Sequence, residues 1–258
     1  MFPQERRKII LDMLKKSKII KIGDLVEKFE VSVETVRRDL EELESKNKLE
    51  RIYGGAIAVT SNSIEPSYAV RVESNHEYKV AIGKSAAALI NNGDAIILDL
   101  GTTCLEIAKN IQHKNITVLT SSLPIMNELA NSNVKIYCLG GLLRPNELSM
   151  SGIIPEYALK QFFVDKAFIA PGGVSFSEGI SDYNIEEAQI RKLFIERAKE
   201  SILVADNSKF GINAFALVAP LESISTIITD WDVDEDILEN IKELNIDVII
   251  AQKNSDLN

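Results

Sequence analysis

The stretch SVETVRRDLEEL, residues 32–43, decides the fold of the first part of the chain. Apolar residues recur in it every three to four positions, which predicts a helix with one face packed inward. That inward face carries Val33, Val36, Leu40 and Leu43. Ser32 stands where its side chain can accept a hydrogen bond from a backbone N–H one turn along the helix. The opposite face carries Arg37 and Arg38, and a DNA major groove would meet this face.

The sequence before this stretch completes a helix pair. A shorter amphipathic run, IGDLVEKF at residues 22–29, precedes it with only Glu30 and Val31 between them. Two helices joined so closely cross steeply, which is the geometry of a helix-turn-helix. An earlier helix is expected over residues 5–16, and it would complete the core of the small domain. Its inward residues are Ile9, Ile10, Met13 and Leu14.

The run LERIYGGAIAV at residues 49–59 predicts the wing of a winged helix-turn-helix. Gly54 and Gly55 permit positive backbone angles, so a hairpin is expected to turn at or near them. Residues 1–59 therefore form the predicted DNA-binding domain, in which basic residues of the first helix and the wing would hold phosphate groups. The residues expected to contact DNA are Ser32, Glu34, Thr35, Arg37, Arg38, Arg51 and Tyr53.

The charge of the chain is divided unevenly. The total is −9, but residues 1–59 carry 13 Lys and Arg against 11 Asp and Glu, a balance of +2, and the rest carries −11. An acidic total argues against wholesale wrapping by nucleic acid or adhesion to an anionic membrane, so DNA contact is expected to be local. A small three-helix domain whose arginines are merely solvated is the alternative, and charge alone does not decide between the two.

Composition favours a cytoplasmic protein without a membrane anchor. Hydrophobic residues make up 45% and charged residues 26% of the chain. No apolar run is long enough to span a bilayer, and the charged N-terminal stretch lacks the apolar core of a signal peptide. Cys104 and Cys138 are isolated, which suits reduced thiols.

A polar, proline-containing linker is predicted at residues 60–68, and the pattern changes after it. Residues 69–258 alternate compact apolar runs with helical stretches, which predicts a larger α/β domain with a mainly parallel sheet covered by helices on both faces. The expected strands are 95–100, 116–120, 134–139, 166–170, 201–205, 226–229 and 247–251. The expected helices lie near 77–91, 103–112, 123–131, 185–200 and 234–244.

Polar residues follow five of these strands, at the end where open parallel sheets bind ligands. Glycines let the backbone approach a ligand, and hydroxyl and N–H groups at a helix start suit an anion such as phosphate. Basic side chains would pair with phosphate, and acidic or amide side chains would accept from sugar hydroxyls. The residues expected at this ligand site are Asp99, Gly101, Thr102, Thr103, Thr120, Ser121, Ser122, Gly140, Gly141, Arg144, Gly179, Asp182, Asn184, Glu187, Arg191 and Lys209.

Each of these features also has an ordinary structural explanation. Hydroxyls at a helix start can be N-caps, Arg144 and Lys209 can be solvated, and Glu187 with Arg191 can form an i,i+4 ion pair. Five strand ends that carry similar polar groups favour a ligand site over five separate coincidences.

Other motifs are excluded. Residues 83–85, GKS, imitate the end of a P-loop, but Tyr78 occupies the position of the required first glycine and the segment is expected inside a helix. His76 and His113 lack the companions of a metal site. No nucleophile elbow or histidine triad is visible. No metal or cofactor is expected.

The chain resembles the DeoR family of bacterial transcription regulators over nearly its whole length. The resemblance rests on VSVETVRRDLEEL at residues 31–43, the paired glycines of the wing, DLGTT at 99–103, Gly140-Gly141 with Arg144, and ADNSKFG at 205–211. It implies a cytoplasmic repressor of a sugar-metabolism operon. It further implies a homo-oligomer, dimer or tetramer, that binds a double-stranded DNA operator and senses a phosphorylated sugar in a domain similar to ribose-5-phosphate isomerase.

The chain departs from the family pattern at two places. It has Ala170-Pro171-Gly172-Gly173 where the family commonly has Gly-Ala-Asp-Gly, and Arg191 where lysine is usual. An isomerase needs a positioned base, so the missing acid argues against residual catalysis, and the expectation is a regulator and not an enzyme. The alternatives are a sugar-phosphate isomerase that uses Asp182 and Glu187 as acid and base, and an architectural DNA binder that ignores metabolites.

Overall fold

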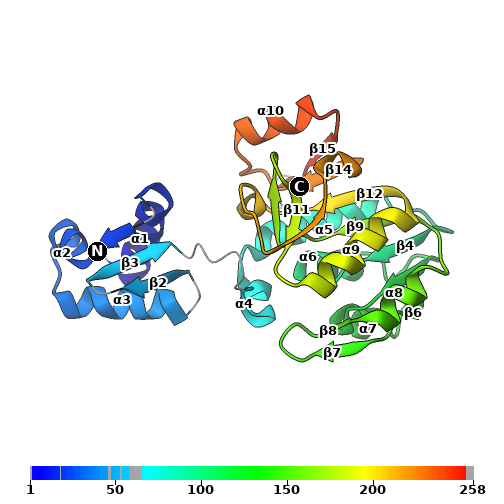
Figure 1. The fold of residues 1–258 in the computed structure, drawn as a ribbon, viewed down its shortest axis with the longest axis horizontal. Coiled ribbons are helices and arrows are strands. Elements are labelled where there is room, and N and C mark those ends of the chain that lie inside the picture. Colours follow the sequence, from blue (N-terminus) through cyan, green and yellow to red (C-terminus); the bar gives the residue numbers. More distant parts are fainter. Residues whose placement is uncertain (1, 18, 46–47, 53, 59–64, 254–258) are drawn as a thin grey trace. The chain divides into compact units, whose positions relative to one another are not determined.

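A computed structural model describes residues 2–17, 19–45, 48–52, 54–58 and 65–253. The chain divides into two compact units, Met1–Ser61 and Asn62–Asn258, and each is described by itself (Figure 1). The linker predicted at 60–68 is described only from Glu65 onward. Tyr53 of the predicted wing lies outside the described residues.

The described residues of the first unit form three helices and a three-stranded sheet. The helices are α1 (Pro3–Ser17), α2 (Ile22–Phe29) and α3 (Val33–Ser45). The strands are β1 (Ile19–Lys21), β2 (Leu49–Ile52) and β3 (Gly55–Ala58), with β3 antiparallel to both of the others. The three predicted helices and the hairpin are confirmed, whereas β1 was not expected because three residues are too few to show a strand period.

The core of this unit follows the predicted helical stripe with one exception. Val36, Leu40 and Leu43 are buried against residues such as Ile10 and Leu25. Val33, however, is 44% exposed, so its expected inward position is wrong. It is the first residue of α3, and the burial of that helix begins one turn later.

Local backbone chemistry fixes the helix pair and the wing. Glu30 ends α2 in the left-handed conformation, with φ 52°. Ser32 Oγ then accepts a hydrogen bond from the backbone N–H of Thr35 at 3.2 Å, which confirms the expected cap. In the hairpin, Gly54 has φ +84°, and a Cβ on Gly55 would lie 2.1 Å from the carbonyl oxygen of Ile20. Glycine therefore permits both the turn and the close approach of β3 to β1.

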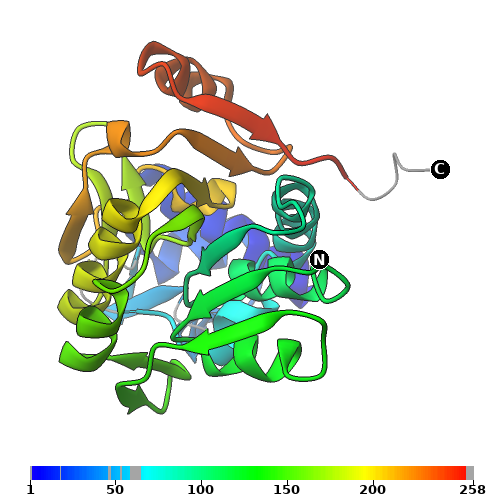
Figure 2. The same ribbon diagram turned by 90° about the vertical axis from the view of Figure 1, so that its right-hand side faces the viewer.

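The second unit is built on a seven-stranded sheet. Its order is β15-β14-β12-β9-β4-β5-β6, and every neighbouring pair is parallel. In Figure 2 the red β15 lies at the upper edge of this unit. All seven expected strands are present: β4 (Ala95–Leu98), β5 (Thr117–Thr120), β6 (Lys135–Cys138), β9 (Val164–Ile169), β12 (Ala198–Val204), β14 (Thr226–Thr229) and β15 (Asp247–Ile250).

Helices cover both faces of this sheet. Ile96 and Leu98 of β4 pack in one core with residues of α5, α6 and α7, and Ile97 packs in a second core with residues of α8, α9 and α10. This alternation along one strand confirms the predicted α/β class. The helices are α5 (His76–Ala88), α6 (Thr102–Lys109), α7 (Leu123–Leu129), α8 (Ile153–Leu159), α9 (Ile185–Arg197) and α10 (Glu235–Glu243).

The second unit also contains shorter elements, and the sequence patterns did not reveal them. Each has three to seven residues, which is too short for a clear helical or strand period. They are helix α4 (Tyr68–Glu73), the hairpin β7 (Leu142–Arg144) and β8 (Ser149–Ser151), helix α8, the antiparallel strands β10 (Gly173–Ser175), β11 (Gly179–Asp182) and β13 (Ala216–Ala219), and the 3-10 turns η1 (Asn207–Lys209) and η2 (Leu221–Ser223).

Candidate DNA interface and ligand site

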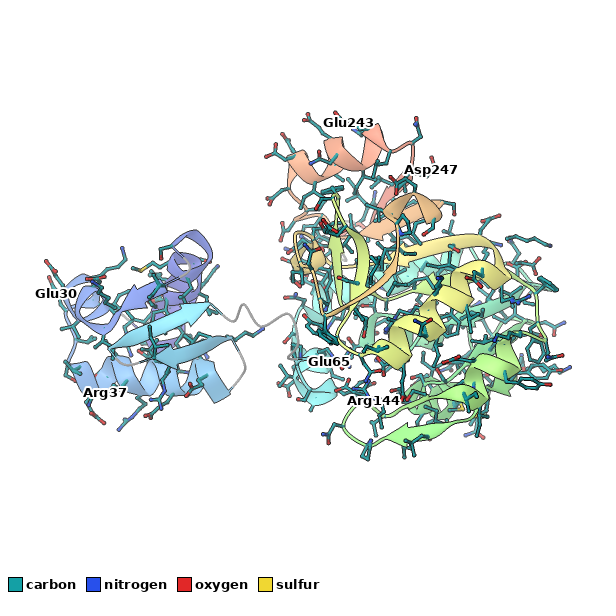
Figure 3. All side chains as sticks on the ribbon, viewed as in Figure 1. Glu30, Arg37, Glu65, Arg144, Glu243 and Asp247 are labelled. Carbon is teal, nitrogen blue, oxygen red and sulfur yellow. The ribbon has the colours of Figure 1, made fainter. Side chains whose placement is uncertain are left out.

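The outer face of α3 presents two arginines. Arg37 is 58% exposed and lies 4.0 Å from the Glu34 carboxylate, one turn before it. Arg38 is exposed, and no hydrogen bond or ion pair ties its side chain to any other described residue. Figure 3 shows Arg37 extending outward from the helix. Both guanidinium groups are therefore available to a groove, with Thr35 beside them.

The arginines of α1 have carboxylate partners within the unit. Arg6 Nε lies 2.7 Å and Arg7 Nε 2.9 Å from the carboxylate of Asp39, which is 2% exposed. Arg7 also lies 2.5 Å from Glu42. These contacts hold α1 against α3. A hollow of about 320 Å³ lies beside them, and it is lined by Pro3, Arg6, Arg7, Ser32, Glu34, Thr35, Arg38 and Asp39.

The wing is braced against the same helix. Arg51 lies 2.7 Å from Glu41 and 2.8 Å from Glu44. Its backbone N–H donates to Glu44 as well, at 2.9 Å, and this hydrogen bond is the main reason that the pKa of Glu44 is lowered. Arg51 therefore has carboxylate partners already and would have to exchange them for a DNA phosphate.

The ligand site predicted in the second unit lies where the strand order reverses. Strand β4 has β5 on one side and β9 on the other, so the crevice between β4 and β9 is a topological switch point. Asp99 follows β4, and its carboxylate accepts a hydrogen bond from the N–H of Ala170, which follows β9, at 2.9 Å. The buried carboxylate thus bridges the ends of these two strands.

Arg191 of α9 enters the same place and is surrounded by carboxylates. Its guanidinium lies 2.6 Å from Asp99, 2.7 Å from Asp182 and 3.7 Å from Glu187. Its side chain is 2% exposed. Burial alone would lower the pKa of Arg191, but the attraction of Asp182, Asp99 and Glu187 outweighs it and raises that pKa. The i,i+4 pair with Glu187 exists, but it is the longest of the three contacts.

Burial also changes the acidity of Asp99. Removal from water raises the pKa of its carboxyl to about 6, although Arg191 and the N–H of Ala170 oppose the change. The site therefore holds a carboxyl group that titrates near neutral pH.

A second cationic group adjoins this cluster. Arg144 forms an ion pair with Glu187, to which Ser149 Oγ also donates at 2.9 Å. The other terminal guanidinium nitrogen of Arg144 lies 3.3 Å from Glu65 (Figure 3). Glu65 lies at the same distance from Arg71, which pairs in turn with Glu147. An alternating chain of charges therefore runs from Asp99 to Glu147.

Lys209 completes the cationic group. It is half-buried, and the described part of the chain offers its ammonium group no hydrogen bond or ion pair. Burial lowers the pKa of Lys209, and the positive charge of Arg71 acts in the same direction, while Asp206, Asp182 and Glu65 oppose them. The ammonium group of Lys209 therefore lies close enough to Arg71 and Glu65 to interact with both of them electrostatically.

The structure thus brings together six of the sixteen ligand residues expected from the sequence, and it gives several others local structural contacts. The six are Asp99, Arg144, Asp182, Glu187, Arg191 and Lys209. Asn184 caps α9 by accepting from the N–H of Glu187 at 3.1 Å. A Cβ on Gly141 would lie 2.5 Å from the carbonyl oxygen of Ser151, and one on Gly179 2.4 Å from that of Ala219. Gly140 has φ +73° and lies beside Ile154 of α8.

The hydroxyl residues line the neighbouring strand ends. Gly101, Thr102 and Thr103 begin α6, whose first turn has no side-chain cap. Thr120 ends β5, Ser121 and Ser122 follow it, and all three residues are buried. Thr120 Oγ1 accepts from the N–H of Ser122 at 3.1 Å, whereas Ser121 Oγ has no hydrogen-bond partner among the described residues.

Sequence reasoning missed three residues of the charge chain and one serine that donates to it. They are Glu65, Arg71, Glu147 and Ser149. They belong to the linker end, the short helix α4 and the β7–β8 hairpin, none of which has a motif or a period. Only the fold brings them to the strand ends.

The described residues contain no group of three or more His, Cys, Asp and Glu side chains placed to hold a metal ion. Within the same residues, no helix combines the length and the apolar character that crossing a membrane requires.

A winged helix-turn-helix unit joined to an α/β unit with a charged site at its strand ends defines a DNA-binding regulator with a sensor domain. Residues 6–62 match the DeoR-like helix-turn-helix domain, and residues 74–231 match the DeoR C terminal sensor domain. The chain belongs to the DeoR family of transcriptional regulators.

Named relatives agree with this assignment. The chain is 33% identical to the HTH-type transcriptional repressor GlcR of Bacillus subtilis over 98% of both chains. It is 35% identical to the transcriptional repressor AccR of Agrobacterium fabrum over 93% of this chain and 94% of that one. These relatives are named as regulators and not as enzymes, which confirms the expectation for this chain.

Among solved structures, the chain is similar to ribose 5-phosphate isomerase A from Methanocaldococcus jannaschii. The similarity covers 53% of this chain and 55% of that one, with a TM-score of 0.40 and 18% sequence identity.

Proposed function

We propose that this regulator is a cytoplasmic repressor of a sugar-metabolism operon and that a phosphorylated sugar, bound at the strand ends of the second unit, controls it. The observation that carries the proposal is the group formed by Arg71, Arg144 and Lys209 beside a switch-point crevice lined by carboxylates. Cationic side chains suit a phosphate, and carboxylate oxygens suit sugar hydroxyls. The hydroxyls at the starts of α6 and α7, and the N–H groups at the start of α6, would add further donors.

The DNA partner is a double-stranded operator. A recognition helix meets base edges through the residues near its start. At or near the exposed start of α3, these residues are Ser32, Glu34, Thr35, Arg37 and Arg38. Tyr53 and Arg51 of the wing would contact the phosphate backbone, Arg51 after leaving its two carboxylate partners.

Reading an operator through two successive major grooves requires two copies of α3, so we propose a homo-oligomer, either a dimer or a tetramer. Helix α8 supports this assignment because it exposes three large apolar side chains. Ile153 is 80%, Ile154 61% and Tyr157 70% exposed. Large apolar side chains gathered on one exposed element are typical of an interface.

The test is the thermal stability of the full chain in the presence of a panel of sugar phosphates and the matching free sugars. A ligand at a hundredfold its dissociation constant adds about 2.7 kcal/mol of stability. Stabilisation by one phosphorylated sugar, and not by the free sugar, is the expected result. A panel with no stabilising compound would contradict the sensor assignment while leaving DNA binding intact.

The hit from this panel is then added to an operator-binding assay. Coupling requires the ligand to bind the DNA-bound and free forms unequally. A change in operator affinity is therefore expected, and an unchanged affinity would contradict control by that ligand.

A further inference from the structure

Glu65 is the residue at which the described part of the second unit begins, four positions after Ser61, the last residue of the first unit. Its side chain is 12% exposed although it lies at the end of a polar linker. Glutamate in a linker is ordinarily solvated, so its burial in the second unit calls for a physical reason.

The reason is a pair of guanidinium groups. One carboxylate oxygen of Glu65 lies 3.3 Å from Arg71 Nη2, and the other lies 3.3 Å from Arg144 Nη2. Close charge-assisted hydrogen bonds measure about 2.7–2.9 Å. The carboxylate therefore spans two arginines without making a short contact with either of them.

The same group keeps unused donors. Arg71 Nε is buried and has no hydrogen-bond partner among the described residues. Lys209 is half-buried nearby and is likewise unpaired within the described ranges. A carboxylate offers two oxygens and one negative charge, whereas a phosphate monoester offers three oxygens and a charge of about −1.5 to −2. Phosphate therefore matches the donors here better than Glu65 does.

The charges of the surrounding side chains also favour the binding of a phosphate. Arg71, Arg144 and Lys209 face the carboxylates of Glu65, Glu147 and Glu187. Burial raises the pKa of Glu147 to about 7, so this group is only partly ionised at neutral pH. If Glu65 left, Arg71 and Arg144 would lose the anionic partner that they share, and an incoming phosphate would replace it.

We propose that Glu65 occupies the anion site of the sensor domain in the absence of ligand and that the phosphate group of the effector displaces it from Arg71 and Arg144. This inference rests on the proposed function and adds its means of control. Displacement releases Glu65 from Arg71 and Arg144, so ligand binding and the position of Glu65 are linked. By reciprocity, whatever holds Glu65 in place weakens phosphate binding.

The experiment measures the affinity of the full chain for inorganic phosphate by calorimetry at constant ionic strength. Glu65→Gln keeps the shape of the side chain and removes the competing charge, so phosphate should bind about tenfold tighter, which corresponds to about 1.4 kcal/mol. Glu65→Asp keeps the charge on a shorter side chain that cannot span both arginines equally well, and it should give an intermediate affinity.

Two further variants serve as controls. Glu73→Gln removes the same charge from an exposed position on α4, so it should leave phosphate affinity close to that of the unchanged chain. Arg144→Ala combined with Glu65→Gln should abolish the gain.

The outcomes separate this inference from the proposed function. Equal phosphate affinity in the Glu65→Gln variant and the unchanged chain would overturn displacement while leaving an anion sensor in place. A gain in Glu73→Gln as large as in Glu65→Gln would also overturn it, since general electrostatics would then explain both. Absence of phosphate binding in every variant would remove the anion site and, with it, both proposals.

Discussion

The guanidinium of Arg191 lies 2.6 Å from the carboxylate of Asp99, and neither side chain is more than 2% exposed. Asp182 and Glu187 approach the same guanidinium. Two charges withdrawn from water lose hydration that their mutual attraction only partly replaces, so such a pair is not in itself a source of net stability. Its effect is positional: it joins the end of β4 to α9 across the switch point.

Removal of Arg191 should therefore be costly. Arg191→Ala leaves three carboxylates without their shared partner, and the loss of one member of a buried ion pair costs about 3–5 kcal/mol. Arg191→Lys keeps the charge but loses the planar fork, so its loss should be smaller. Urea unfolding of the full chain measures both. Lys192→Ala, on an exposed position of the same helix, is the matched control, and an equal loss in it would refute the argument.

Arg38→Ala should weaken operator binding about 10- to 100-fold, because a base contact by arginine is worth about 1–3 kcal/mol. Fluorescence anisotropy with an operator duplex and with an unrelated duplex gives the two affinities. The loss should be larger for the operator, since a base contact carries the sequence information.

Lys192→Ala again serves as the control, because it removes one positive charge from the other unit and should have little effect on either affinity. If the Arg38 variant binds the operator as tightly as the unchanged chain, α3 does not read DNA through this residue.

The stability of the second unit should depend on the ionisation of Glu147. Burial raises the pKa of this carboxyl from 4.5 to about 7 in the folded chain, so the folded state binds more protons than the unfolded state between these values. Its contribution to stability is complete below pH 4.5 and is lost as the pH rises through about 7. Glu147→Gln resembles the protonated form at every pH, so its stability should not show this loss.

Thermal unfolding from pH 4.5 to 8 tests this expectation. The stability of Glu147→Gln minus that of the unchanged chain should grow with pH, by about 3 kcal/mol at most, and level off above about 7. Glu243→Gln, exposed at the end of α10, should give a flat difference. A flat difference for the Glu147 variant as well would show that the pKa is not raised.

The sequence predicted those parts of the fold that show a clear pattern of apolar residues. The stripe from Val36 to Leu43 and the seven apolar runs of the second unit show one or two faces that must be buried, and all became helices or strands at the expected places. Val33 shows where this reasoning fails, because a residue can match the stripe and still lie beyond the end of the core. A periodic pattern shows which face of a helix is buried. It does not show at which residue along the helix that burial begins or ends.

The candidate site was predictable only in part, for a similar reason. Asp99, Asp182, Glu187 and Arg191 follow or flank elements that the sequence predicts, so the strand-end rule brought them together. Arg71 and Glu65 lie before the first predicted helix of the second unit and reach the site only because α4 folds back onto it. That contact depends on the tertiary path of a short segment, which leaves no trace in spacing or composition.

The apolar surface of α8 should be where copies of the chain meet. Ile153 and Tyr157 lie one turn apart and are 80% and 70% exposed, and association would remove both from water. The double variant Ile153→Glu with Tyr157→Glu places two charges on that face, so assembly through it should weaken at least about tenfold. Sedimentation equilibrium gives the mass of each species.

Phe215→Glu together with Leu217→Glu is the matched control, because these residues are also exposed, at 60% and 65%, but belong to β13 and the turn before it. Dissociation of the α8 variant alone is expected, followed by loss of affinity for a two-site operator and not for a single half-site. An unchanged mass would place the contact elsewhere, and a loss of mass in the β13 variant alone would assign the contact to that strand.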